Sequence, residues 1–299
     1  MQELRNDPIL VPKNYGMTPF WSPADQGNST AQANLGFAYT YGRGVEKNAI
    51  QANEWFLKAA VLGHAKAQLE LGYNYDVGNG CEIDLNQALK WYRAAAEQGN
   101  STAQTNMGMA YTYGRGVDKS AIQANEWFLK SAAVGDAKAQ YYLAWNYQIG
   151  DGIAQNLKSA VHHYQSAVEG ENQWAKILLG NCHQYGIGVK RDDKKALETF
   201  RSALDGEASQ WARLYIAMMS EHGYGVIPDQ QQATEEYAAL ASEGNSLGMA
   251  HLSRTYAYGI GREVDLKNAS HWISKAVEQK SCCGYAFQAD FLKAGLSGQ

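Results

Sequence analysis

The sequence predicts an all-α protein, an α/α solenoid of helix pairs stacked into a right-handed superhelix. Three observations predict this fold. Residues 28–60 and 100–132 are nearly identical, since only six of their 33 positions differ. A third segment, 64–99, lies between them and shares their skeleton, which makes the repeating unit 36 residues long. Each unit also holds one Gly-X-Gly triplet between two hydrophobic patterns of helical period.

The boundaries between units follow a fixed spacing, which predicts about seven repeats. The junction residues are Gly27, Gly63, Gly99, Gly135, Glu171, Glu207 and Gly244. The last interval is one residue longer than the others, and we place the extra residue near Gly223, in the sixth repeat. This repeat departs most from the pattern, because Met219 takes the place of a tyrosine and Glu236 that of a tryptophan.

The first helix of each repeat carries small or apolar residues at positions i, i+4, i+5 and i+8, which form one face of an α-helix. In the first repeat these are Ala31, Leu35, Gly36 and Tyr39. The Gly-X-Gly triplet follows, and its glycines supply the positive φ angles that end a helix and turn the chain.

The second helix begins at a residue that is a good N-cap in every repeat. These residues are Asn48, Asp84, Ser120, Asn156, Asp192, Asp229 and Asp265. Glutamines three residues later, such as Gln51 and Gln87, predict capping boxes. Alanines and an aromatic pair, such as Trp91 and Tyr92, follow at core spacing, so we expect these rings to fill the space between repeats.

We expect three parts along the chain. Residues 1–27 do not repeat and end in a stunted helix, including Phe20 and Trp21, that caps the first repeat. Residues 28–280 form the solenoid, and residues 281–299 contain a C-terminal half-repeat as a capping helix.

The repeat pattern resembles the Sel1-like repeat, a relative of the tetratricopeptide repeat with a longer loop between its helices. The resemblance lies in a Leu-Gly-X-X-Tyr-X-X-Gly-X-Gly core followed by Asp-X-X-X-Ala-X-X-Trp-Tyr-X-X-Ala-Ala-Glu-Gln-Gly, which residues 63–99 match almost throughout. It implies a bacterial-type, non-enzymatic adaptor that binds proteins on a concave wall, in roles such as signalling, host interaction and secretion.

Composition excludes several other classes. The formal net charge is -4 and no Lys/Arg-rich run is present, which argues against nucleic-acid binding. The longest apolar run near the start, Pro8 to Val11, is too short for a signal peptide or a membrane span. We therefore expect a soluble monomer without a membrane span. The compartment stays open: cytoplasmic, or periplasmic or secreted after removal of a signal peptide.

No residue pattern predicts catalysis, a cofactor or a metal site. The glycine loops lack the surroundings of a phosphate-binding loop, and their recurrence indicates a structural role. His163 occupies a tryptophan position of the repeat, which favours packing over a metal site with His162. The four cysteines follow no ligand spacing. A bound metal or small molecule in the purified protein would revive an enzymatic interpretation.

Positions counted from each junction predict a binding wall on the first helices, opposite their core face: the third, sixth, tenth, thirteenth and fourteenth. Aromatic and arginine side chains gather there, as they do in protein interfaces. The candidate partner-binding residues are Phe37, Tyr41, Tyr73, Met109, Tyr113, Tyr141, Trp145, Trp174, Tyr185, Arg254 and Tyr258. An alternative stays open for the fourteenth-position tyrosines, which could instead pack on the next loop.

The wall predicts a scaffold or adaptor that holds a protein partner, such as an effector, toxin or signalling protein, in its concave groove. The later repeats present Arg213, Glu221 and Arg254 there, so we expect the partner to anchor in the aromatic N-terminal half. A narrower alternative is an immunity or inhibitor protein that neutralises a secreted bacterial toxin or effector enzyme. The near-identical copies at 28–60 and 100–132 favour recent duplication, which is compatible with a changing partner.

Overall fold

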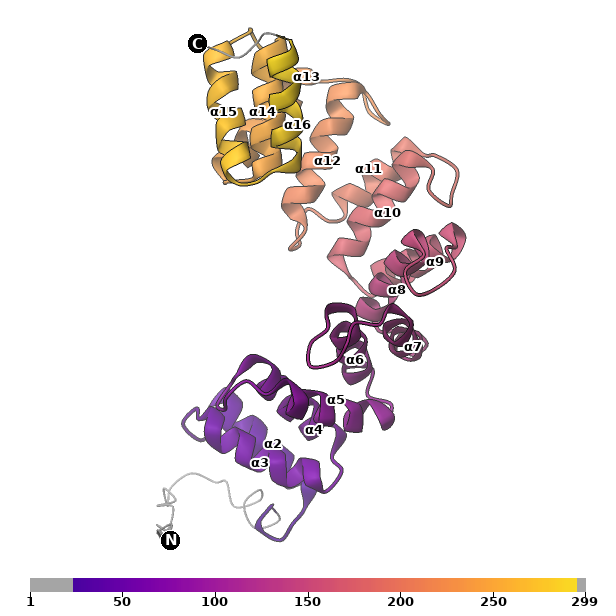
Figure 1. Ribbon diagram of the computed structural model, residues 1–299, viewed down its shortest axis with the longest axis vertical. Coiled ribbons are helices and arrows are strands. Elements are labelled where there is room, and N and C mark those ends of the chain that lie inside the picture. Colours follow the sequence, from indigo (N-terminus) through magenta and orange to yellow (C-terminus); the bar gives the residue numbers. More distant parts are fainter. Residues whose placement is uncertain (1–23, 295–299) are drawn as a thin grey trace. The chain divides into compact units, whose positions relative to one another are not determined.

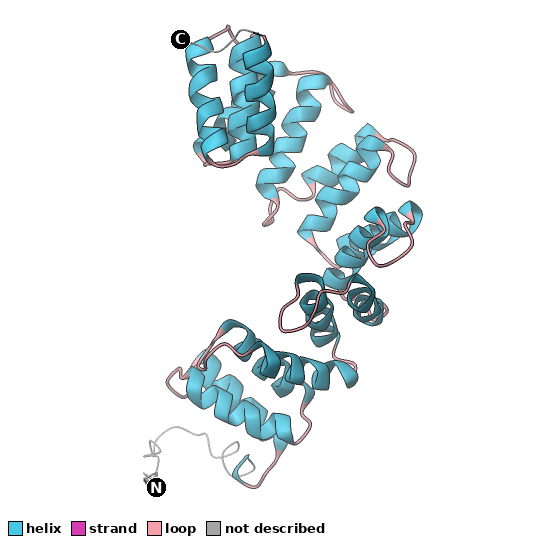
Figure 2. Cartoon of the chain, in the orientation of Figure 1, coloured by secondary structure: helices cyan, strands magenta, loops and turns pink. Residues whose placement is uncertain are grey.

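The computed structural model describes residues 24–294, and within this range it contains helices and loops but no strand (Figure 2). The all-α prediction is therefore confirmed. The chain divides into two compact units at Asp136 and Ala137, inside the stretch that we predicted as one solenoid. Phe20 and Trp21, the predicted cap residues, lie outside the described residues.

The first unit holds three helix pairs, labelled in Figure 1. Its helices are α2 (Ser29–Tyr41), α3 (Ala49–Val61), α4 (Ala65–Val77), α5 (Leu85–Glu97), α6 (Ser101–Tyr113) and α7 (Ala121–Ala132). Each first helix packs against the second helix of its own repeat, and α4 and α6 also pack against the second helix of the repeat before.

The second unit holds four helix pairs and a final single helix (Figure 1). Its helices are α8 (Ala137–Ile149), α9 (Leu157–Glu169), α10 (Gln173–Tyr185), α11 (Asp193–Arg201), α12 (Ser209–His222), α13 (Gln230–Ser242), α14 (Ser246–Tyr258), α15 (Leu266–Glu278) and α16 (Cys282–Lys293). The last helix packs on both α14 and α15, and α11 is the shortest of the set, with nine residues.

The second helix of every repeat begins after its predicted N-cap residue, whose side chain accepts a hydrogen bond from the backbone N–H three residues later. The predicted capping box is wrong. It would need the N–H of the cap to donate to the glutamine, but in Asp84 this N–H donates across the loop to the carbonyl oxygen of Tyr75, at 3.0 Å. The backbone N–H groups of Asn48, Ser120 and Asp229 likewise donate to a carbonyl oxygen across the loop.

The Gly-X-Gly loop turns the chain where the sequence predicts it. Gly78 is the C-cap of α4, with φ at 77°, and Gly80 follows with φ at 71°. A Cβ on Gly80 would lie 2.5 Å from the backbone of Ala49 in the preceding repeat. The second glycine is therefore required both for its backbone angle and for the close approach of two repeats.

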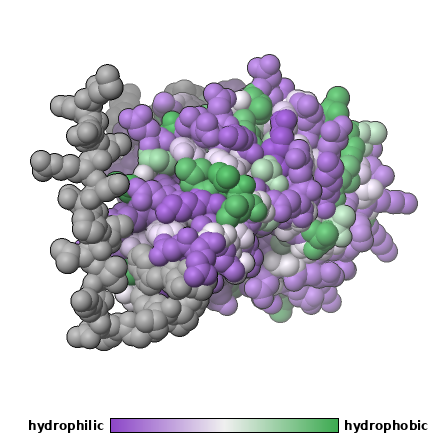
Figure 3. All heavy atoms as spheres, turned by 90° about the horizontal axis from the view of Figure 1, so that it is seen from below, coloured by the Kyte–Doolittle hydropathy of each residue, from purple (hydrophilic) through white to green (hydrophobic). Residues whose placement is uncertain are grey.

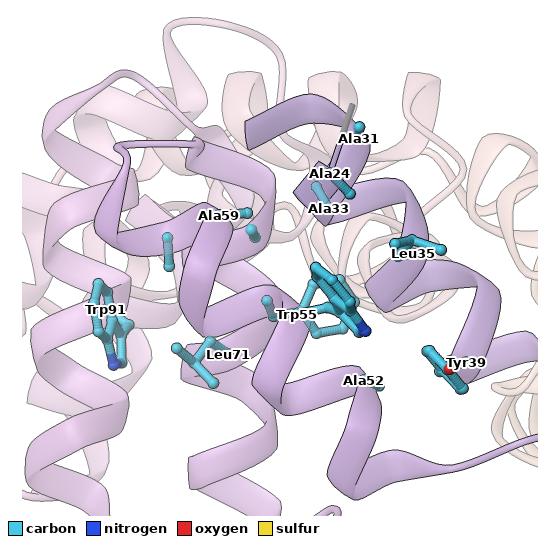
Figure 4. Packing of buried hydrophobic residues seen from close by; sticks show 13 residues of the cluster. Ala24, Ala31, Ala33, Leu35, Tyr39, Ala52, Trp55, Ala59, Leu71 and Trp91 are labelled. Carbon is cyan, nitrogen blue, oxygen red and sulfur yellow. The ribbon is translucent and has the colours of Figure 1, made fainter. Parts of the chain in front are cut away.

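Aromatic residues of the second helices fill the core as predicted. Trp55 and Phe56 belong to a buried cluster with residues of α2 and α4, and Figure 4 shows Trp55 between Leu35 and Leu71. The ammonium group of Lys58 covers the outer face of the Trp55 ring, 3.8 Å from its centroid.

The extra residue lies between α11 and α12, not near Gly223 as predicted. Gln173-Trp174-Ala175 in α10 returns as Gln210-Trp211-Ala212 in α12, already 37 residues later. Because α11 ends early, the turns at residues 202–208 can take up one additional residue.

This insertion changes two assignments in the sixth repeat. The Asp84 N–H donates to the carbonyl oxygen of Tyr75, and the equivalent Asp229 N–H donates to the carbonyl oxygen of Ser220. Ser220, and not Met219, therefore stands at the tyrosine position. By the same register His222, and not Glu221, is the last residue of the first helix.

Candidate protein-binding surface

The last residue of the first helix is exposed wherever it is a tyrosine. In the first unit, Tyr41 and Tyr113 end α2 and α6 with 53% and 51% of their surface exposed. The Tyr41 ring stacks on Phe37, with centroids 6.4 Å apart, and lies beside the guanidinium group of Arg43. Intramolecular packing therefore covers only part of these rings.

The tenth position is more varied. Tyr73 on α4 is 50% exposed, whereas Phe37 and Met109 are half-buried. The ring of Phe37 contacts Phe56 edge-on, with centroids 5.1 Å apart, so it belongs partly to the core. Among the candidate residues of the first unit, Tyr41, Tyr73 and Tyr113 are thus the exposed ones.

In the second unit the wall is rich in tryptophan. Trp145 on α8 and Trp174 on α10 are both exposed, at 40% and 37%. Tyr185 and Tyr258, which end α10 and α14, are more than half and about half exposed. Tyr141 is half-buried and contacts the ring of Tyr142 edge-on, with centroids 5.3 Å apart.

Trp211 was not among the residues predicted from the sequence. It stands on α12 at the position that Trp174 holds on α10, and the two indole rings meet edge-on with centroids 6.4 Å apart. Both are 37% exposed. The signal was present in the repeated Gln-Trp-Ala triplet, but the misplaced insertion concealed the equivalence.

The sixth position does not belong to the exposed wall as predicted. Ala33, Thr105, Ile177 and Ala250 are buried, and Tyr141 is only partly exposed. In the sixth repeat the corrected insertion places the buried Leu214 at this position, instead of the predicted Arg213. The reason is that a first helix inside a stack packs against helices on two sides, which buries a wider arc than one amphipathic face.

Two charged residues predicted on the wall form a buried ion pair instead. The Glu221 side chain is 4% exposed, and its carboxylate accepts hydrogen bonds from the Arg254 guanidinium, at 2.6 Å, and from the Tyr237 hydroxyl, at 2.9 Å. Arg254, a predicted partner-binding residue, is therefore occupied within the chain. Burial, and secondarily the charge of Arg254, lower the pKa of the adjacent His251 to about 4.

The described residues contain no group of three or more His, Cys, Asp or Glu side chains that could hold a metal ion. His163 stacks on Tyr147, with centroids 5.5 Å apart, in the packing role expected of its tryptophan position. Burial raises the pKa of the Cys182 thiol to about 11, which disfavours the thiolate form. Between residues 24 and 294, every helix is too short or too polar to span a lipid bilayer.

The face drawn in Figure 3 is largely hydrophilic, with hydrophobic residues in separate small groups. The wall also exposes the aliphatic side chains of Val77 and Ile149, and its exposed rings belong to tyrosines and tryptophans. Tyrosine and tryptophan combine a large apolar area with a polar group, as is typical of protein-binding surfaces.

Comparison with known proteins gives a family match over most of the chain. The Sel1 repeat matches seven segments: 29–64, 65–100, 101–136, 137–172, 175–206, 212–245 and 246–281. The number of repeats and the resemblance predicted from the sequence are confirmed. No curated protein matches the chain.

Solved structures with the same repeat are similar over nearly the whole chain. A protective antigen of uropathogenic Escherichia coli strains is 30% identical with a TM-score of 0.78, over 92% of this chain and 59% of its own. A Sel1 repeat protein from Oxalobacter formigenes is 29% identical with a TM-score of 0.68, over 90% and 77%. The chain thus spans less than two thirds of the antigen's length. An immunity protein from Pseudomonas aeruginosa, 16% identical over 86% and 83% with a TM-score of 0.42, is too distant to inform function.

Proposed function

Since the chain belongs to the Sel1 repeat family, we propose that it is a non-catalytic scaffold that binds another protein through exposed aromatic residues of its first helices. The Trp174–Trp211 pair carries the proposal. Two neighbouring repeats each hold a tryptophan that is 37% exposed, and the two rings meet edge-on. Tryptophan is the residue type most enriched among those that dominate binding energy in protein interfaces.

The packing beneath the pair favours binding over stability as its role. The alanine that follows each tryptophan, Ala175 or Ala212, is fully buried and anchors the helix in the stack. The rings themselves project from helices held on both sides by neighbouring helices. A partner that covers them would bury a large apolar area without ordering a flexible segment, which lowers the entropic cost of association.

The first test compares the intact chain with the Trp174→Ala and Trp211→Ala double variant. The partner is captured by crosslinking, identified and purified, and its dissociation constant is then measured by calorimetry. We expect the affinity to fall by ~30-fold or more, which corresponds to ~2 kcal/mol, with the melting temperature nearly unchanged. Ile227→Ala is the matched control, because Ile227 is 86% exposed in the same unit but lies in a loop.

Equal affinities for the double variant and the intact chain would refute the proposal, and so would a large fall in melting temperature. Single changes then locate the anchor. We predicted an anchor in the N-terminal half, whose first four repeats include Tyr73 and Trp145, so changing either to alanine should weaken binding at least as much as Trp174→Ala. The reverse order would place the anchor at the Trp174–Trp211 pair.

The immunity or inhibitor role is a narrower form of the same proposal. It requires a single partner enzyme, a tight complex of fixed stoichiometry and loss of that enzyme's activity in the complex. An adaptor would instead leave the partner's activity intact or bind two partners at once. Activity of the purified partner, measured with and without this chain, separates the two roles.

A further inference from the structure

A pocket of about 230 Å³ lies between α11 of the fifth repeat and α12 and α13 of the sixth. Its walls are mostly apolar and come from all three helices and their loops. The apolar lining residues are Leu197, Leu204, Ile216, Ala217, Val226 and Ala233. Leu204, which is 38% exposed, lies in the turns after α11, so the pocket opens to solvent.

The pocket exists because two rings of the repeat are missing. In the fourth repeat, Tyr147 and His163 stack with centroids 5.5 Å apart. Their equivalents in the sixth repeat are Ser220 and Glu236, and both line the pocket. Every other repeat has an aromatic residue or histidine at the Ser220 position. The small serine therefore leaves open a space that is filled elsewhere.

The short helix α11 widens the same space. It ends at Arg201, whereas the other second helices have 12 or 13 residues. Leu197 and Arg201 of this helix line the pocket, together with Leu204 in the turns that follow it.

Of the two arginines that line the pocket, one is held in ion pairs and, among the described residues, the other is not. Arg213 lines it but is held by ion pairs with Glu236 and Glu243. Arg201 lines it as well and forms no ion pair with any carboxylate between residues 24 and 294. One guanidinium group therefore remains available at an apolar pocket, where it would favour an anion.

We propose that this pocket binds an aromatic group that carries a carboxylate, with the ring against the apolar walls and the carboxylate on Arg201. An apolar protein cavity of ~150 Å³ accepts benzene, so the larger pocket has room for a bicyclic ring such as indole. The source would be either a free aromatic acid or the C-terminal residue of a peptide. This proposal is independent of the aromatic wall and of its protein partner.

Calorimetric titration of the intact chain with indole-3-acetate tests the proposal. We expect saturable binding with a dissociation constant of ~0.1–1 mM, as suits a ligand of this size. Ser220→Tyr restores the side chain of the other repeats and should weaken binding by at least ~10-fold by filling the pocket. Arg201→Gln should weaken it several-fold, and indole without the carboxylate should bind more weakly than the acid.

Ser220→Ala is the matched control, because it leaves the pocket open and should bind like the intact chain. Circular dichroism checks that each variant folds. If Ser220→Tyr does not fold, Arg201→Gln at the exposed Arg201 carries the test. No saturable binding, or binding that neither variant changes, would overturn the proposal.

A peptide arm separates the two sources. N-acetyl-Gly-Gly-Trp with a free C-terminal carboxylate is compared with the same peptide amidated. Tighter binding of the free peptide than of indole-3-acetate assigns the pocket to a peptide C-terminus. Binding of indole-3-acetate alone assigns it to a small aromatic acid.

Discussion

The second and sixth repeats share their helix caps and loop hydrogen bonds, but they differ in the residues that occupy the space between the helices. Both begin their second helix at an aspartate N-cap, Asp84 or Asp229, and both bond the N–H of this residue back across the loop. In the second repeat the space between helices is closed by Tyr75 and by Trp91, which is 8% exposed. In the sixth it is an open pocket.

The two repeats show that the residues that position the helices differ from those that fill the space between them. Caps, loop glycines and small residues at helix contacts are common to both repeats, and they position the helices. The rings add stability but are dispensable for the path of the chain. A repeat can therefore lose its aromatic pair and still keep its place in the stack, which leaves room for a ligand.

The largest expected effect comes from emptying the closed repeat. Trp91→Ala should lower the free energy of unfolding by ~3–5 kcal/mol, because it leaves a cavity in the core. Glu236→Ala at the equivalent position should cost less than ~1 kcal/mol, since it removes only partly exposed ion pairing with Arg213. Urea denaturation of both variants measures the difference, and similar losses would contradict the distinction between the two repeats.

A second difference lies in the ion pairs. Arg254→Met should destabilise by ~3 kcal/mol, because the buried Glu221 carboxylate would lose the guanidinium group with which it pairs. Arg115 of the third repeat pairs with Asp76 of the second at 2.8 Å, but the Arg115 side chain is 46% exposed. Arg115→Met should therefore cost ~1 kcal/mol or less.

The double change Arg254→Met with Glu221→Gln is the check on this interpretation. It removes the unpaired charge while Tyr237 can still donate to the amide oxygen, so most of the lost stability should return. If the double variant is as unstable as Arg254→Met alone, packing and not charge explains the loss.

Most of the helix caps and turns could be predicted from the sequence, because they depend on residues close together in the chain. Asp84 and Gly78 act through neighbours a few residues away, so their residue types suffice to place them. The capping box does not form, because the backbone N–H of Asp84 that it requires donates instead to the carbonyl oxygen of Tyr75, on the other side of the loop. The four-residue capping-box pattern does not include Tyr75, so it could not reveal this competing hydrogen bond.

The wall was predicted less completely than the caps and turns. A helical wheel gives the directions of side chains, but it does not show that neighbouring helices cover Ala33 and Thr105 on a second side. The insertion was misplaced because spacing between junctions shows that a residue was added, without showing where. Aligning Trp211 with Trp174 would have located it and added Trp211 to the wall.

The seventh repeat should respond to acid. His251 contacts the rings of Tyr237 and Phe287, and burial lowers its pKa to about 4, against 6.5 for an ordinary histidine. Between these values the unfolded chain binds a proton that the folded chain excludes, so stability falls as the pH falls from 6.5 towards 4. We expect ~2 kcal/mol to be lost over this range.

His251→Phe provides the control for this pH dependence, because it keeps a ring against Tyr237 but does not titrate. Melting temperatures of both proteins are measured at intervals from pH 7.5 to 4.5. The difference between them should change in favour of the variant as the pH falls. A constant difference would show that other groups cause the acid sensitivity.

The smallest expected effect is a gain. In the second, fourth and sixth repeats a buried tyrosine of the second helix lies 16 residues after a polar acceptor. The Tyr164 hydroxyl donates to Gln148 at 3.0 Å, and Tyr237 donates to Glu221. The fifth repeat has Gln184 as the acceptor but Phe200 at the tyrosine position, and the side-chain oxygen of Gln184 is buried without a hydrogen bond.

Phe200→Tyr should therefore stabilise the fifth repeat by ~1 kcal/mol, because the added hydroxyl can donate to the unpaired Gln184 oxygen. The same change at Phe128 is the control, since its counterpart Thr112 already donates to the Gly108 carbonyl, at 3.0 Å, and offers no unpaired buried oxygen. Urea denaturation should show a gain at Phe200 and none at Phe128. Equal responses at the two sites would mean that the pairing of tyrosine with an acceptor 16 residues earlier does not stabilise the repeat.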